Sequence, residues 1–429
     1  MERINIGLVG FGTVGRSFYE LVKKHSERLR KQLGVELYIS KVGVGNPGKK
    51  RDLLPDTELV EGYEDIVRDP GIEIVVELVG GIDKPLDLIK KAISNGKHVI
   101  TANKALLADR GEELFRLARE RGVELKFEAS VGGGIPVIKV IRESLKGNEI
   151  YNISGILNGT TNYILTRMTE EGLDFKEALR EAQEAGFAES DPTLDIEGID
   201  AAQKISLLAG LAFRGWVDYR DVYCEGITGI TKKDIEFATL SGFVFKLVAS
   251  AKMLDGVPAV SVFPALLPKG HPLASVRNEY NAVMIESDFL GKSMYLGRGA
   301  GGKATASSVA SDLGDLIERI RMKAKPDPVG LEGFTRFKLF PQEDREFKYY
   351  LHFVTENRPG IWATVTGLLA SNNINIESVH QKWEDPSEPS DLYIMVDKAR
   401  ESNINKAYGE IVASDGIYES SKFFRILED

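Results

Sequence analysis

The stretch "INIGLVGFGTVGRSFYELVKK" (residues 4–24) decides the fold of the first part of the chain. Its first residues form an apolar run typical of a buried strand, and its last residues place apolar side chains at helical spacing. Between them, Gly10, Gly12 and Gly15 form a G-x-G-x-x-G pattern. Such glycines permit a tight turn, let the backbone approach a pyrophosphate and let the helix pack on the strand. The stretch therefore predicts a strand, a turn and a helix that bind a dinucleotide.

Strands and helices continue to alternate over the next hundred residues. Strands are predicted at 36–45, 72–81, 97–104 and 123–130, and helices at 84–95 and 106–121. Because such alternation produces a parallel sheet, we predict an α/β fold with a Rossmann-type, doubly wound parallel sheet over residues 1–137. A nucleotide cofactor is favoured over a cofactor-free fold, since the motif and its context agree.

Length and composition limit the classes of protein to consider. With 429 residues, the chain exceeds the size at which one core keeps growing, so two or three domains are expected. A formal charge of −9 argues against a nucleic-acid-binding surface. The single cysteine, Cys224, excludes an intrachain disulfide and fits a reducing cytoplasm. Without a signal peptide or a run of 18 apolar residues, we expect a cytoplasmic protein that binds neither membranes nor nucleic acids.

The cofactor preference depends on the end of the second predicted strand. That strand ends in "VGN" (residues 44–46), without the acidic residue that would bind an adenosine ribose. Lys49, Lys50 and Arg51 follow, and they either bind a 2′-phosphate or form a solvated basic turn. We expect NADP as the cofactor, with NAD as the alternative.

The stretch "DPTLDIEGIDAAQK" (residues 191–204) carries a second candidate site and runs directly into "ISLLAGLAF". Asp200 and Lys204 are one helical turn apart, and the helix around them is apolar on nearly every side, so it should be buried. The pair is either a structural ion pair or part of a catalytic site. Lys104 follows "HVIT" at the carboxyl end of a strand, the edge at which open α/β sheets bind ligands.

Further acidic residues, Glu189 and Asp195, precede this helix. One lysine beside several carboxylates suits a small substrate with an ammonium group, because the acids hold the amine while the lysine acts on an alcohol or carbonyl oxygen. We place this substrate site in residues 138–299. The glycine loop "GRGAGG" (residues 297–302) should return to the cofactor domain with residues up to about 325 and line the cleft; a plain flexible loop is the alternative.

Seven motifs follow one another along residues 1 to about 325: "GFGTVG", "ELVGG", "HVITANKALLA", "FEASVGGGIP", "GILNGTTNYIL", "AESDPTLDIEGIDAAQK" and "GRGAGG". Together, in this order and spacing, they resemble the homoserine dehydrogenase family. The resemblance implies the reversible, NAD(P)-dependent interconversion of L-homoserine and L-aspartate 4-semialdehyde, on the route to threonine, isoleucine and methionine.

The resemblance also implies roles for single residues. Lys204 would exchange a proton with the carbonyl oxygen, and Lys104 would lie at the nicotinamide and the substrate. Glu189 and Asp200 would hold the homoserine amine, with Asp195 as a partner or water-positioning group. At Gly45, NADP-preferring relatives often have an arginine, so this position bears on the cofactor preference. Further implied cofactor contacts are Phe11, Thr13, Val14, Gly186 and Gly301. A monovalent cation, Na⁺ or K⁺, is implied at the main-chain carbonyls of Glu128, Val131, Gly133 and Ile135.

The last eighty residues predict a separate unit. After a polar, proline-rich link (326–346), residues 347–429 show strand and helix patterns in βαββαβ order, typical of a ferredoxin-like fold. This unit resembles an ACT domain, whose segments at 357–361 and 375–376 would face an amino-acid effector between paired domains. Threonine is the expected effector by pathway logic, and a dimerisation module without a ligand is the alternative. We expect a homodimer or homotetramer.

Two other functions compete with this interpretation. One is another Rossmann-type semialdehyde or sugar dehydrogenase, which would leave homoserine inert. The other is a non-catalytic regulator that binds NADP and an amino acid. The presence of both lysines and all the matched acids argues against such a regulator, which would be free to lose them.

Overall fold

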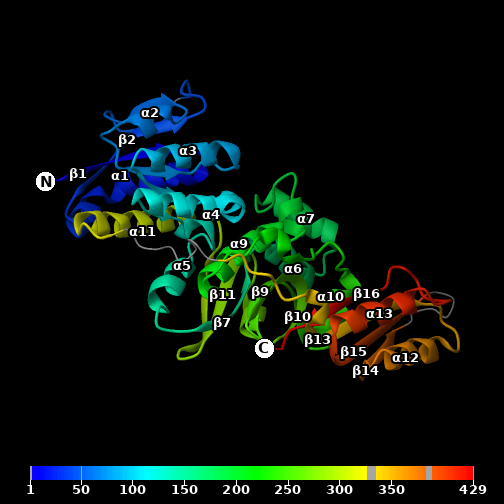
Figure 1. Ribbon diagram of the computed structural model, residues 1–429. Helices are drawn as coiled ribbons and strands as arrows, with labels where there is room; N and C mark the ends of the chain where they lie inside the picture. The colour runs from blue at the N-terminus through cyan, green and yellow to red at the C-terminus, as the bar shows by residue number, and fades with distance from the viewer. Residues whose placement is uncertain (1, 50, 326–334, 383–388, 429) are drawn as a thin grey trace.

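The computed structural model describes residues 2–49, 51–325, 335–382 and 389–428. Its first sheet is parallel throughout, in the order β3-β2-β1-β4-β5-β6. Figure 1 labels β1 and β2 of this sheet near the N-terminus. The strands are β1 (Arg3–Val9), β2 (Glu36–Val44), β3 (Glu58–Glu61), β4 (Ile74–Glu77), β5 (His98–Thr101) and β6 (Leu125–Lys126). The predicted Rossmann-type sheet is confirmed, whereas β3 was not predicted from the sequence.

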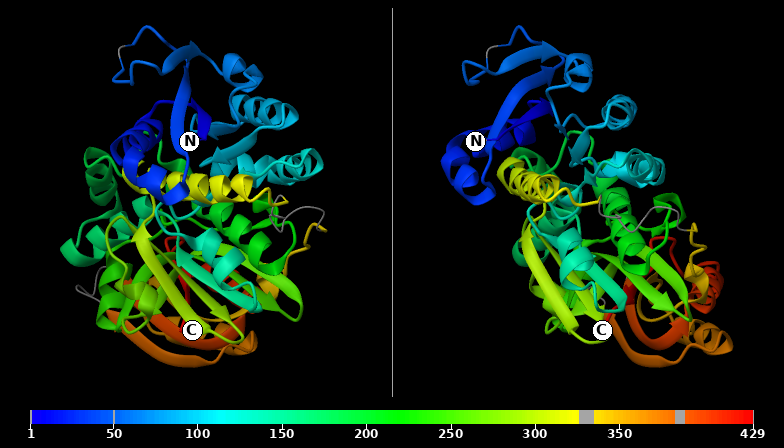
Figure 2. Two further views of the ribbon diagram at one scale, coloured as in Figure 1. Left: turned by 90° about the vertical axis from the view of Figure 1, so that its left-hand side faces the viewer. Right: turned by 60° about the vertical axis from the view of Figure 1, so that its left-hand side comes forward.

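Helices cover both faces of this sheet. They are α1 (Thr13–Leu33), α2 (Glu64–Arg68), α3 (Asp83–Ser94), α4 (Lys104–Arg121) and α11 (Gly302–Arg321). The apolar residues of α1 and α11 share one core with the sheet, and those of α2, α3 and α4 share the other. Figure 2 shows α11, in yellow, lying beside α1 beneath the first sheet. The chain thus returns to the first unit after the glycine loop.

A second, mixed sheet follows the order β12-β11-β7-β9-β10-β16-β13-β15-β14, with β8 paired to β10. Its first strands are β7 (Ile150–Ile156), β8 (Tyr223–Cys224), β9 (Phe243–Leu254), β10 (Val257–Pro268), β11 (Tyr280–Ser287) and β12 (Gly291–Arg298). The helices of this region are α5 (Val137–Lys139), α6 (Gly159–Glu171), α7 (Phe175–Glu184), α8 (Thr193–Ile196), α9 (Ile199–Phe213) and α10 (Lys232–Leu240). Helix α9 lies between α4 and this sheet, which explains why it is apolar nearly all round.

The C-terminal unit has the expected βαββαβ order. It consists of β13 (Glu346–Thr355), α12 (Ile361–Ser371), β14 (Ile376–Lys382), β15 (Ser390–Arg400), α13 (Glu401–Val412) and β16 (Lys422–Ile426). Its sheet is not separate, because β16 pairs in parallel with β10. Residues 326–334 of the expected link lie outside the described residues. In the described part of the link, Phe337 packs against Gly215, and Phe337 N donates to the Trp216 carbonyl. These residues of the link therefore pack on the middle unit.

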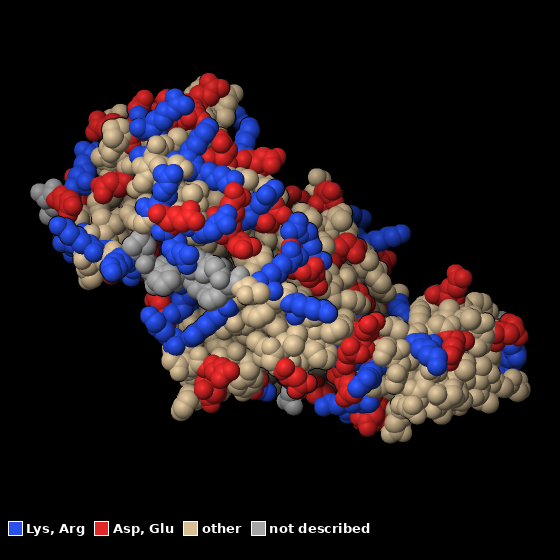
Figure 3. Space-filling view, in the orientation of Figure 1, with Lys and Arg blue, Asp and Glu red and all other residues tan. Residues whose placement is uncertain are grey.

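Buried charges also join the C-terminal unit to α10. The ring nitrogens of His352 on β13 each lie 2.8 Å from a carboxylate oxygen, Nδ1 from Asp234 of α10 and Nε2 from Asp391 of β15. Since a neutral imidazole has only one N–H, two carboxylate neighbours favour the protonated ring. On the surface, acidic and basic residues intermingle over the first unit, whereas much of the visible face of the C-terminal unit is uncharged (Figure 3). Among the described residues, no helix is long and apolar enough to cross a membrane.

Candidate active site

Three charged side chains form a row where α4 meets α9. The Nζ of Lys104 lies 2.9 Å from Oδ1 of Asp200, and the Nζ of Lys204 lies 2.6 Å from Oδ2 of the same carboxylate. Lys204 also donates to the carbonyl oxygen of Leu157 at 2.7 Å. Asp200 and Lys204 are 6 % and 7 % exposed, whereas the side chain of Lys104 is 38 % exposed. One buried carboxylate therefore bridges a buried lysine and a lysine that reaches solvent.

Local structure explains why these side chains meet. Strand β5 ends at Thr101, and Lys104 is the first residue of α4, after Asn103 whose side chain caps the helix by accepting from Leu106 N. Helix α9 begins after Gly198, which has a φ of 82°, and Asp200 is its second residue. The contact between α4 and α9 thus joins the carboxyl edge of the first sheet to the second unit.

Asn158 connects this row to a further carboxylate. Its Nδ2 donates to Oδ2 of Asp200 at 2.9 Å and to Oδ1 of Asp195 at 2.6 Å, while its Oδ1 caps α6 by accepting from Thr161 N. The Oγ1 of Thr160 lies 3.2 Å from Asp195 Oδ2, while its single hydroxyl hydrogen is donated to the Phe187 carbonyl at 2.7 Å. Asn158 therefore both caps the helix and binds two acids of the site.

Electrostatic interactions shift the pKa values of the row. Burial lowers the pKa of Lys204, although Asp200 opposes this change. Burial also acts to raise the pKa of Asp200, but the charges of Lys204 and Lys104 outweigh it and lower that pKa below its ordinary value. The charge of Asp200 raises the pKa of Lys104, and burial raises the pKa of Asp195. The row therefore holds an ionised Asp200, with Lys204 as its most easily deprotonated lysine.

Glu189 and Gly186 lie on the loop that follows α7. Glu189 is exposed and makes no ion pair among the described residues, but its charge contributes to raising the pKa of Lys104. Gly186 has a φ of 75° and open space where a side chain would be. The adjacent Phe187 accepts a hydrogen bond from Thr160 Oγ1 at its carbonyl, which ties this loop to α6.

The glycine-rich turn leaves room for a pyrophosphate beside the N-terminus of α1, where Thr13 and Val14 open the helix. Gly10 has a φ of 99°, and a β-carbon there would lie 2.4 Å from the carbonyl oxygen of Leu78. A β-carbon at Gly15 would lie 2.1 Å from the Gly10 carbonyl oxygen, whereas one at Gly12 would meet nothing within 4 Å. Phe11 packs edge-on against Tyr19, with ring centroids 5.6 Å apart.

Two loops flank this turn. After Gly301, which has a φ of 107°, a β-carbon at Gly302 would lie 2.9 Å from the Thr13 carbonyl oxygen, so the late glycine loop contacts the start of α1. At the end of β2, nothing lies within 4 Å of a β-carbon at Gly45. Arg51 donates to the carbonyl oxygens of Lys49 and Asn46, which engages it within its own turn. Lys49 is exposed, and Lys50 lies outside the described residues.

The loop expected to bind a cation is buried and already hydrogen-bonded. The carboxylate of Glu128 accepts from the N–H groups of Ile138 and Lys139, both at 2.9 Å. The Gly133 carbonyl accepts from Ser308 Oγ, and the Ile135 carbonyl accepts from Val137 N. Val131 is fully buried. Burial raises the pKa of Glu128 to about 8 and that of Asp312, which accepts from Glu128 N, to about 7.

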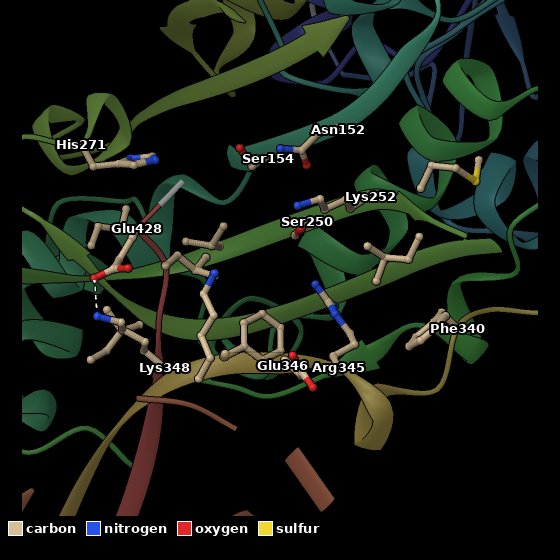
Figure 4. A pocket seen from close by; sticks show the side chains of 18 of the residues that line it. Asn152, Ser154, Ser250, Lys252, His271, Phe340, Arg345, Glu346, Lys348 and Glu428 are labelled. Atoms are coloured by element: carbon tan, nitrogen blue, oxygen red, sulfur yellow. Dashed lines mark ion pairs between the residues drawn. The ribbon is translucent and has the colours of Figure 1, made fainter. Parts of the chain in front are cut away.

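A cavity of about 640 Å³ lies apart from the lysine row, against the opposite face of the second sheet. Figure 4 shows Asn152, Ser154, Ser250 and Lys252 on the sheet, with Arg345 reaching toward them from the chain near β13. No residue that the sequence marks as catalytic, substrate-binding or cofactor-binding lines this cavity. The predicted catalytic lysines and Asp200 instead meet at the junction of α4 and α9.

A parallel sheet with a glycine-rich turn where its strand order reverses, and a buried lysine–carboxylate row reached from the end of β5, are typical of nicotinamide-dependent oxidoreductases. The family model "Homoserine dehydrogenase, NAD binding domain" matches residues 10–128, and "Homoserine dehydrogenase" matches residues 136–313. The homoserine dehydrogenase of Synechocystis sp. is 40 % identical over 434 residues, covering 99 % of each chain. The chain belongs to the homoserine dehydrogenase family.

Two solved structures extend this comparison. The crystal structure of a homoserine dehydrogenase from Thiobacillus denitrificans matches with a TM-score of 0.93 and 36 % identity, over 100 % of this chain and 99 % of that one. A hyperthermophilic archaeal homoserine dehydrogenase in complex with NADPH matches with a TM-score of 0.62 and 29 % identity, over 76 % of this chain and 99 % of that one. About a quarter of this chain therefore has no counterpart in the archaeal enzyme.

Proposed function

We propose that the chain interconverts L-homoserine and L-aspartate 4-semialdehyde with NADP or NAD, in threonine, isoleucine and methionine biosynthesis in the cytoplasm. The row Lys104–Asp200–Lys204, which begins just past the carboxyl end of β5, supports this proposal, because a buried lysine paired with a carboxylate suits proton transfer to a substrate oxygen. We divide the chain into a cofactor domain (1–137 with about 300–325), a substrate and dimerisation domain (138–299), a link (326–346) and a regulatory unit (347–429).

Lys204 is the proposed acid and base of the reaction. The nicotinamide ring supplies the hydride acceptor or donor when it is bound. In the oxidation, Lys204 takes the hydroxyl proton of homoserine, and in the reduction it returns that proton to the aldehyde oxygen. Of the three N–H bonds of its ammonium form, two are directed at Asp200 and the Leu157 carbonyl, and we assign the third to the substrate oxygen.

Glu189, Asp195 and Asp200 are the proposed contacts of the substrate ammonium group. A carboxylate has about four lone-pair positions. At Asp200, Lys204 and Asn158 occupy Oδ2, and Lys104 contacts Oδ1. Little of Asp200 is left for the substrate, so we assign the larger share of the amine contact to Glu189 and Asp195. Lys104, which reaches solvent, is assigned to the substrate and the nicotinamide.

The cofactor residues of the glycine turn fit a bound dinucleotide, since Gly12 leaves open space at the N-terminus of α1. NADP is the proposed cofactor, with Lys49 and Lys50 near its 2′-phosphate, and NAD remains the alternative because Gly45 offers no charge. A Na⁺ or K⁺ ion is proposed at the carbonyls of Glu128, Val131, Gly133 and Ile135. Gly133, in the middle of this loop, has a φ of 54°. The carbonyl oxygens of Gly133 and Ile135 each accept one hydrogen bond and keep a second lone pair for a cation.

We also propose that the C-terminal unit is an ACT-type sensor of an amino acid, with threonine as the first candidate, in a homodimer or homotetramer. Helix α12 contains no charged residue, and Trp362 on it is 42 % exposed, as suits a surface covered by a second copy. The turn at 357–361 leads into α12 and residues 375–376 follow this helix at the start of β14, so the two segments lie at opposite ends of α12. A dimerisation module without a ligand is the competing proposal.

Initial rates of homoserine-dependent reduction of NAD and NADP, with and without Na⁺ or K⁺, test the proposed function. Homoserine oxidation by the wild type but not by the Lys204→Met variant would support the proposed function. The ratio of the rates with NAD and NADP would give the cofactor preference. A folded protein that oxidises a sugar but not homoserine would favour another dehydrogenase. Cofactor binding without turnover of any amino alcohol or semialdehyde would favour a regulator.

A further inference from the structure

Arg425 on β16 is a buried cation shared between two parts of the molecule. It is 1 % exposed. Within the C-terminal unit, its Nε lies 2.8 Å and its Nη2 lies 2.5 Å from the two carboxylate oxygens of Glu401. Toward the middle unit, its Nη1 lies 2.6 Å from Oε2 of Glu225, and its Nη2 lies 2.9 Å from the hydroxyl of Tyr223. The guanidinium therefore joins the C-terminal unit to the chain just after β8.

The segment that carries Glu225 packs directly on the segment that leads into α9. The Ile227 N–H donates to the Ile196 carbonyl at 2.9 Å, and the Cys224 thiol lies 3.1 Å from the Glu197 carbonyl oxygen. A β-carbon at Gly226 would lie 2.4 Å from the Ile196 carbonyl oxygen, so the two backbones touch. Residues 224–227 thus pack along residues 196–198, the segment that joins Asp195 to Asp200.

We infer that Glu225 and Arg425 form a positioning link through which the C-terminal unit holds the start of α9, and with it Asp200, in place between the two lysines. This inference rests on the proposed function, because it concerns how accurately the catalytic row is assembled. The left-handed Gly198 fixes the direction in which α9 begins, and a β-carbon at this glycine would lie only 3.0 Å from the Cys224 sulfur. A shift of residues 224–227 is therefore transmitted to Asp200.

The charge of Glu225 is not needed to neutralise Arg425 within its own unit. Glu401, which is 2 % exposed, already pairs with the guanidinium through both carboxylate oxygens. The Glu225 side chain is 34 % exposed, so Gln at this position remains solvated. Glu225→Gln should therefore weaken the link while leaving the fold intact.

The test compares Glu225→Gln with Lys233→Met in the full-length chain. Lys233 is a matched control, because its 2.7 Å ion pair with Asp391 also joins the middle and C-terminal units but does not involve residues 224–227. We expect E225Q to lower kcat for homoserine oxidation about tenfold, since small misplacements of reacting groups are costly. The pH at which kcat/KM rises with deprotonation of Lys204 should move lower, because a displaced Asp200 no longer raises the pKa of Lys204 as strongly.

The control variant should keep the wild-type kcat and pH profile. A merely structural role would reduce thermal stability or the yield of folded enzyme without moving the pH profile, and that result would overturn the inference. So would equal kinetics in the two variants. If E225Q does not fold, Glu225→Asp replaces it in the comparison, because its side chain is one methylene shorter and reaches Arg425 less closely. Turnover by wild type and K233M shows that the proposed function holds, whatever the outcome for Glu225; an inert wild type would refute that function instead.

Discussion

Replacing Asp200 by Asn removes the negative charge between Lys104 and Lys204 while keeping the size of the side chain. The amide can still accept hydrogen bonds, but it cannot offset the charge of the buried Lys204. Burial already lowers the pKa of Lys204, and without Asp200 that pKa should fall further. We expect a folded variant that is less stable and turns homoserine over slowly.

The cost in stability has an upper limit, because a buried lysine can release its proton instead of staying charged. Deprotonating a lysine of ordinary pKa at pH 7.5 costs about 4 kcal/mol, from about 1.36 kcal/mol for each pH unit. Since burial already lowers the pKa of Lys204 in the wild type, we expect a loss of about 2–4 kcal/mol in the free energy of unfolding. The unfolded lysine binds a proton that the folded variant lacks, so the loss should shrink as the pH rises.

Urea unfolding of the wild type and D200N, from about pH 7.5 to about pH 9.5, measures this difference directly. Glu184→Gln is a suitable control, because Glu184 is an exposed residue of α7 outside the lysine row. Equal stability of D200N and the wild type at the lower pH would refute the reasoning. A loss that stays constant across the pH range would refute it as well, since it would not arise from the protonation of Lys204.

Three other variants test further parts of the structure. Lys204→Met should reduce homoserine oxidation by at least about 10²-fold with unchanged circular dichroism, and a near-normal rate would remove Lys204 from the mechanism. At His352, burial lowers the pKa, but hydrogen bonds with Asp234 and Asp391 outweigh it, so the folded pKa is raised. Its stabilisation is complete below the unfolded pKa of about 6.5 and is lost as the pH rises through the folded pKa. The difference in unfolding free energy between wild type and His352→Gln should therefore decrease above neutral pH, and a constant difference would contradict this. Gly45→Arg should lower the KM for NADP relative to NAD, because the position is open; an unchanged ratio of KM values would place the 2′-phosphate elsewhere.

The parts of the fold that the sequence predicts are those with strong local patterns. The glycine turn and the apolar helix around Asp200 belong to this class, because spacing alone defines them. Strand β3 and helix α2 have only four and five residues, too few to show a period. The meeting of Lys104 with Asp200, and the second use of Asn158, depend on contacts between distant segments that no local pattern records.

The pairing of β16 with β10 also covers a strand edge that could otherwise pair with strands of other molecules. One edge of β10 is occupied by β9 along its length, and the other is shared by β8 at Ser261 and Val262 and by β16 at Ala265 and Leu266. Removal of residues 346–429 would uncover the backbone groups of Ala265 and Leu266 in a strongly apolar strand. Such open edges recruit strands from other molecules. A shortened chain should therefore aggregate during expression rather than yield a smaller, active enzyme.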